Sequence, residues 1–107
     1  MRKIDIDSTP TQELSIPFEN DYIFLKMMFR DDCWIMNARY RDKVKNGLGI
    51  SCGVLMLTGF NLPFDFTISS KINGLDPFLI DSFESGNFEL YLLERDELIE
   101  IRGNDVP

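Results

Sequence analysis

Apolar and polar residues alternate from Leu14 to Arg41, and this period of two constrains the fold more than any other feature of the chain. Because the side chains of a β-strand point alternately to opposite faces, the alternation predicts half-buried strands. Short polar breaks at Asn20-Asp21 and Asp31-Asp32 predict the turns between them. Pro17 lacks a backbone N–H and therefore confines its strand to an edge or a bulge. The three predicted strands are 14–19, 22–30 and 33–41, and the last two are expected to form a β-hairpin.

After residue 41 the pattern is less regular. Asn46-Gly47 predicts a turn over 42–49, and Asn73-Gly74 predicts another, because glycine adopts positive φ without steric cost. Proline and small polar residues predict an extended, irregular segment over 60–66. The stretch 95–101 suits a short helix and a strand equally well. Further strands are predicted at 50–57, 78–83 and 88–93.

Six or seven short strands at hairpin spacing predict an all-β fold, either a small antiparallel β-sandwich or a barrel. The 107 residues are enough for one domain. Residues 1–13 are polar, contain Pro10 and show no sustained period, so we expect a flexible arm that becomes ordered only if something holds it. The β domain is expected over 14–107, with an acidic C-terminal extension at 94–107.

The net charge of −7 belongs to the C-terminal third of the chain. Residues 1–75 hold equal numbers of acids and bases, whereas 76–107 hold nine acids and two arginines. Patches of opposite sign steer docking and select its register, so we expect self-association or a fit between different subunits, with two solvated faces as the alternative. The basic candidates for such contacts are Arg39, Arg41, Lys43 and Lys45. The acidic candidates are Glu94, Asp96, Glu97 and Glu100.

Histidine is absent, which removes the commonest general base and metal ligand and every Ser-His or Cys-His nucleophile pair. Cys33 and Cys52 lack CxxC spacing, and two thiols without histidine are too few for a structural zinc site. We therefore expect no catalytic residues, no cofactor and no metal. We also expect both cysteines to be buried thiols, with a disulfide between neighbouring strands left open.

The acidic composition does not provide the basic surface that nucleic acids require, so no nucleic-acid partner is expected. The longest apolar stretch, 50–57, is far shorter than the roughly 20 residues of a membrane helix. The N-terminus has a basic pair but no apolar region behind it, unlike a secretory signal. We expect the protein to be made in the cytoplasm and to have no membrane association.

A set of core positions and turns resembles the baseplate plug family of contractile-tailed bacteriophages. The resemblance covers 18–93 and depends on a tryptophan-led strand, a Gly-x-x-Leu-like spacing and a closing strand with a tyrosine. The segments that carry it are Trp34-Ile-Met-Asn-Ala-Arg-Tyr40, Gly47 to Gly49, Gly53-Val-Leu-Met-Leu-Thr-Gly59-Phe-Asn-Leu62, Gly74 to Asp81 and Phe88-Glu-Leu-Tyr91. It implies a small, β-rich, non-enzymatic structural subunit of the virion, oligomeric within the central baseplate hub, among tail-tube, hub and spike proteins.

Two alternative functions stay open. An acidic inhibitor or decoy would use the C-terminal carboxylates to block a basic nucleic-acid-binding site of a partner. A hydrolase that uses only carboxylates would need two acids about 5 to 10 Å apart, such as Asp81 with Glu84 or Glu89.

Overall fold

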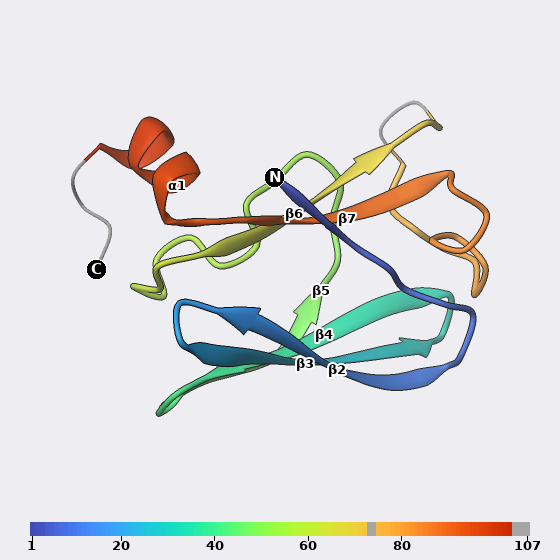
Figure 1. Ribbon diagram of the computed structural model, residues 1–107. Coiled ribbons are helices and arrows are strands. Elements are labelled where there is room, and N and C mark those ends of the chain that lie inside the picture. Colours follow the sequence, from blue (N-terminus) through green and yellow to red (C-terminus); the bar gives the residue numbers. More distant parts are fainter. Residues whose placement is uncertain (73–74, 104–107) are drawn as a thin grey trace.

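A computed structural model describes residues 1–72 and 75–103 of the chain (Figure 1). Two antiparallel sheets pack as a sandwich, which confirms the predicted small all-β fold. The strand order is β2-β3-β4-β5 in one sheet and β1-β7-β6 in the other, and a short helix follows β7. The elements are β1 (Arg2–Ile4), β2 (Thr11–Phe18), β3 (Asp21–Arg30), β4 (Cys33–Tyr40), β5 (Lys43–Gly49), β6 (Asp65–Ser70), β7 (Phe88–Leu93) and α1 (Arg95–Arg102).

Tight hairpins build the four-stranded sheet, and the predicted strands at 14–19, 22–30 and 33–41 are all present in it. The two-residue turns at Glu19-Asn20 and Asp31-Asp32 have positive φ at both positions, as in the type I′ turns that match the twist of a hairpin. Pro17 lies in β2, which is an edge strand as predicted. Alternation continues through β3 and β4, so that one face of each is buried.

The prediction of a turn over 42–49 is wrong, because this segment is β5. The turn is shorter and lies at Arg41-Asp42. Gly47, with φ 73°, forms a β-bulge in β5 instead: its N–H donates to the Asn37 side-chain oxygen at 2.8 Å, and the register of the β4–β5 ladder shifts there.

The prediction of a strand over 50–57 is also wrong. This apolar segment crosses from the four-stranded to the three-stranded sheet, and its backbone N–H groups bond in both: Ile50 to the Trp34 carbonyl at 3.1 Å, and Met56 to the Phe66 carbonyl at 3.0 Å. Ile50 and Leu57, at its two ends, are buried in the core, whereas Val54 between them is exposed. The irregular segment expected over 60–66 ends earlier than predicted, because the strand β6 begins at Asp65.

The segment expected to be a flexible arm is held in place. β1 pairs with β7, Ile4 and Ile6 are buried, and Thr11 already belongs to β2. The arm lacks a sustained period because its short strand lies on one sheet and its far end on the other (Figure 1).

Residues 78–83 lie in the connection between β6 and β7, in which 80–86 form turns, and this corrects the prediction of a strand over 78–83. Ser82 explains the difference, because its hydroxyl accepts from the Leu79 N–H at 3.0 Å and its own N–H donates back to the Leu79 carbonyl at 3.1 Å. Such local serine bonds compete with strand pairing. The predicted strand at 88–93 is confirmed as β7. The turn expected at Asn73-Gly74 lies outside the described residues.

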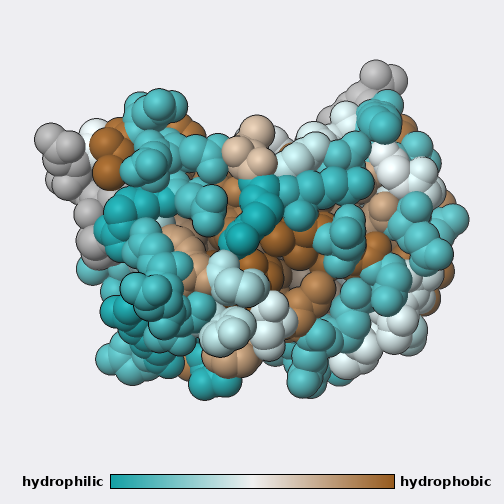
Figure 2. All heavy atoms as spheres, viewed as in Figure 1, coloured by the Kyte–Doolittle hydropathy of each residue, from teal (hydrophilic) through white to brown (hydrophobic). Residues whose placement is uncertain are grey.

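The core lies between the sheets and contains an aromatic cluster with edge-to-face contacts. Phe64 contacts Phe18, Tyr40 and Phe66 with ring centroids 5.2 to 5.8 Å apart. Figure 2 shows apolar atoms in the seam between the two sheets on the face seen in Figure 1.

The stretch 95–101, which suits either helix or strand, is helical. Glu94 caps α1 through a capping box with Glu97, and Gly103 ends the helix with φ 72°. Leu98 is the buried residue of the helix.

Candidate interaction surfaces

Large apolar side chains gather on the surface in one short segment, which we call the apolar loop (residues 75–80). Leu79 is 52% exposed and Phe78 43%, although both belong to residue types that folding usually buries. The exposed apolar residues of the loop are Leu75, Phe78, Leu79 and Ile80.

The backbone of the apolar loop is fixed to the core. The indole N–H of Trp34, which is 1% exposed, donates to the Leu79 carbonyl at 3.0 Å, and the Asp76 carboxylate accepts from the Cys52 N–H at 2.8 Å. Ser82 is buried and bonds Leu79 in both directions. The loop therefore presents its apolar side chains from a fixed backbone.

The basic candidates do not share one side of the molecule, because the chain turns at Arg41-Asp42. Arg39 lies on the outer face of the four-stranded sheet, over the Phe24 ring. Arg41 bonds Asp21 at 3.2 Å. Lys43 donates to the Asn61 carbonyl at 2.6 Å, and the Lys45 amine lies 4.5 Å from the Phe60 ring centroid.

Of the acidic candidates, two stabilise α1 and two face solvent. Glu94 and Glu97 form the capping box. Glu97 also bonds the α-amino group of Met1, a hydrogen bond that lowers the pKa of Glu97. Asp96 and Glu100 are exposed and form no salt bridge with another described residue.

The edge of β2 is open for pairing. The Phe29 N–H donates to the Pro10 carbonyl, and because bonded pairs alternate in an antiparallel ladder, Thr11, Glu13 and Ser15 direct their backbone groups away from β3. Pro17 has no N–H, and its carbonyl accepts from Arg2 at 2.8 Å. The open edge is therefore 11–15, whereas the other edge of this sheet, β5, is interrupted by the Gly47 bulge.

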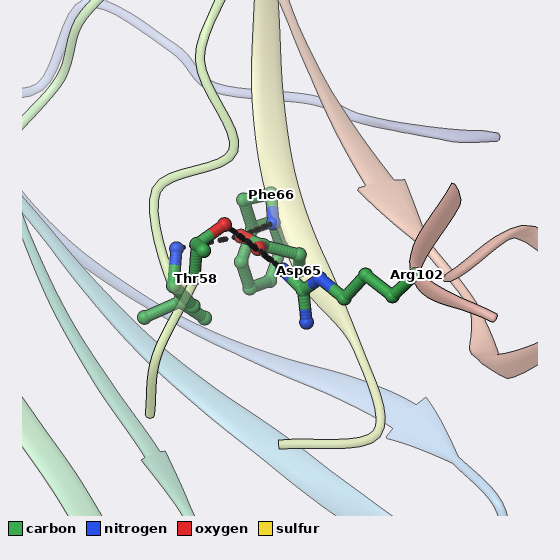
Figure 3. Close-up of polar contacts among 5 residues, drawn as sticks. Thr58, Asp65, Phe66 and Arg102 are labelled. Carbon is green, nitrogen blue, oxygen red and sulfur yellow. Dashed lines mark hydrogen bonds and ion pairs between the residues drawn. The ribbon is translucent and has the colours of Figure 1, made fainter. Parts of the chain in front are cut away.

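One buried ion pair lies at the junction of α1 with β6 (Figure 3). The Asp65 side chain has no exposed surface; it accepts from the N–H groups of Leu57 and Phe66, each at 2.7 Å, and bonds Arg102 and Thr58. Burial raises the pKa of Asp65, while these hydrogen bonds and the Arg102 charge act in the opposite direction. The salt bridge joins the last residue of α1 to the first residue of β6, so the carboxylate has a structural role in holding α1.

Both cysteines are free thiols, and the expectation that both are buried is wrong for Cys33, which is exposed beside the Asp31-Asp32 turn. Cys52 is half-buried.

No group of three or more Cys, Asp or Glu side chains within 1–72 and 75–103 is placed to hold a metal ion. No helix in the described part of the chain is long and apolar enough to cross a membrane.

Sequence reasoning missed the apolar loop, because exposed and buried apolar residues look alike in a sequence. Pro77 and Ser82 were the available signals, since proline and serine within an apolar run favour a turn over a strand.

The sequence matches no protein family model and no curated protein. The resemblance to baseplate plug proteins therefore stays a prediction from the sequence.

Proposed function

We propose that this protein is a structural subunit that connects other proteins in an assembly, and that the assembly is the central baseplate hub of a contractile phage tail. The observation that carries the proposal is the apolar loop, where Leu75, Phe78, Leu79 and Ile80 are exposed on a backbone fixed by Trp34 and Ser82. Several large apolar side chains exposed within one short loop of a folded domain favour a protein-binding role. The choice of a phage baseplate as the assembly comes from the resemblance to the baseplate plug family.

Two further features support an assembly role. The open β2 edge at 11–15 offers backbone donors and acceptors to an extended segment of a partner. A preformed loop also binds with little loss of conformational entropy, because its order does not depend on the partner. In this proposal the apolar loop provides apolar contact area, and backbone hydrogen bonds along the β2 edge orient the partner segment.

The test is co-expression of the tagged chain with tail-tube, spike and hub proteins of a contractile phage tail, followed by co-purification and affinity measurement. We expect capture of at least one of them. Leu79→Asp is expected to weaken that binding at least about tenfold, because it places a charge in the centre of the contact. Val54→Asp is the matched control, since Val54 is 49% exposed but lies outside the loop.

Absence of capture by any tail protein, or equal affinity for L79D and V54D, would contradict the proposal. Salt-sensitive binding to a nuclease that is lost on neutralising Glu94, Glu97 and Glu100 would instead favour the decoy. That alternative is weakened by the use of Glu94 and Glu97 in the capping box.

A further inference from the structure

The outer face of the four-stranded sheet combines cations with exposed aromatic rings. Phe24, 37% exposed, lies opposite Arg39 in the β3–β4 register, and the Arg39 guanidinium carbon is 4.4 Å from its ring centroid. The ring of Tyr22, 49% exposed, is centred 6.3 Å from that of Phe24. A groove of about 550 Å³ runs over this face between Glu13 and Asn46. We call this surface the basic face.

Positive charge predominates on the basic face. Strand alternation places three cations on it, Lys26, Arg30 and Arg39, with Glu13 as the acid of β2, and Arg41 follows in the turn after β4. Arg41 is paired with Asp21, whereas Lys26, Arg30 and Arg39 form no salt bridge with any residue in 1–72 or 75–103. These three charges are available to an acidic partner.

An acidic ridge on α1 has the complementary composition. Asp96, Ile99 and Glu100 are spaced three and four residues apart and so lie on one side of the helix. The opposite side carries the buried Leu98. Ile99, 38% exposed, flanks the two carboxylates on one side, as Phe24 is exposed beside the cations of the basic face. Both surfaces therefore combine an exposed apolar side chain with charges, and the charges of the two surfaces are opposite in sign.

The two surfaces lie on opposite sides of the sandwich, so they cannot meet within one chain. In Figure 1, α1 lies on the side of the three-stranded sheet, above the seam, and the outer face of the four-stranded sheet points away from it. We propose that the occupant of the basic face is the acidic ridge of a second copy of this chain, in a head-to-tail contact. Such a contact uses different surfaces on the two copies and repeats, giving a ring if the rotation closes and a filament if it does not.

The distribution of charge makes this contact compatible with a net charge of −7. Residues 1–75 are balanced, and the excess of acids lies after residue 75. Two copies therefore repel when their α1 ends meet and attract when α1 of one copy meets the basic face of the next. Charge thus selects head-to-tail contact over symmetric pairing.

Mass measurement of the purified chain by light scattering or sedimentation, as a function of concentration and salt, tests the proposal. At about 0.01 M ionic strength, where charges interact over about 30 Å, we expect the mass to rise above the 12.4 kDa of one chain. At about 1 M, where that distance is about 3 Å, we expect it to return toward one chain.

Charge reversal identifies the surfaces. The double variants K26E/R39E and D96K/E100K are each expected to weaken self-association at least about tenfold. The quadruple variant K26E/R39E/D96K/E100K restores opposite signs and is expected to associate like the wild type. An equimolar mixture of the two double variants is also expected to associate, because each has the surface that the other lacks. Lys3→Glu, on the other sheet, is the control and is expected to associate like the wild type.

A chain that stays at 12.4 kDa at every concentration and low salt overturns the proposal. So does association that survives either double variant, or a quadruple variant that stays dissociated although its unfolding midpoint equals that of the wild type. The proposal does not depend on the tail partners, because its test contains this chain alone. L79D is expected to leave self-association unchanged, so failure here is distinguishable from failure of the proposed function.

Discussion

The guanidinium of Arg102, at the end of α1, forms a salt bridge with the fully buried carboxylate of Asp65, at the first position of β6. This pair joins the C-terminal helix to the three-stranded sheet. Removing one member of a buried pair leaves the other charge without compensation, and this costs more than the pair contributes as a whole.

Arg102→Met is therefore expected to destabilise the protein by roughly 3 kcal/mol, because Asp65 would keep a buried charge without its cation. Urea denaturation followed by tryptophan fluorescence measures the change. Arg30→Met, at an exposed position, is the control and is expected to stay within about 0.5 kcal/mol of the wild type. Equal stability of the two variants would show that the ion pair does not hold α1.

The Trp34 indole links the core to the apolar loop through Leu79. Trp34→Phe removes this hydrogen bond and leaves a small cavity, so we expect a loss of roughly 2 kcal/mol together with faster amide exchange over 75–82. Hydrogen exchange measured by mass spectrometry separates the local effect from global unfolding. If exchange increased equally in β3 and in the loop, Trp34 would have no special role in fixing the loop.

Gly47 and Gly49 form a matched pair in β5. A Cβ added at either position would meet no atom within 4 Å, but Gly47 has φ +73° and Gly49 is outside the left-handed region. We expect Gly47→Ala to cost about 1 kcal/mol, because an L side chain is strained at that φ. Gly49→Ala is expected to be neutral or slightly stabilising. Thermal unfolding of both variants tests this, and equal costs would count against the bulge.

The pair of Glu19 with Arg95 is expected to make the free energy of unfolding depend on pH. Hydrogen bonds from Arg95, at 2.8 and 2.9 Å, lower the pKa of Glu19 from its ordinary value of 4.5. Because the folded-state pKa is the lower one, the stabilisation is fully present above pH 4.5 and is lost as the pH falls through the folded-state pKa.

Glu19→Gln should therefore lower stability at pH 7 and reduce the slope of stability against pH below 4.5. Urea midpoints measured between about pH 7 and pH 3 provide the test. An unchanged slope in E19Q would show that the pair with Arg95 does not form in solution.

The part of the fold that sequence predicted well is the part determined locally. The hairpins from Leu14 to Tyr40 depend on alternation and on short polar turns, and both are properties of neighbouring residues. The glycine bulge was mistaken for a turn, because Gly47 needs positive φ in either setting. Only the partner strand distinguishes the two.

The remaining errors come from long-range contacts. Apolar residues over 50–57 and 78–83 have the composition of strands, but they cross between sheets or are fixed by residues distant in the sequence. Trp34 and Leu79 are 45 positions apart, and no local pattern indicates that they are bonded. The acidic C-terminal third could be predicted from charge composition. The division of the basic candidates between two places could not, because it depends on the two-residue turn at Arg41-Asp42.

Because β1 pairs with β7, the three-stranded sheet cannot form until β7 has been synthesised. The four strands of the other sheet pair with their neighbours in sequence, whereas β1 precedes the other described strands and pairs with β7, the last of them. A fragment that ends before Phe88 would keep Ile4 and Ile6 uncovered, and its strand edges would be available to chaperones and proteases. Burial of Ile4 and Ile6 therefore requires a chain that has been translated through β7.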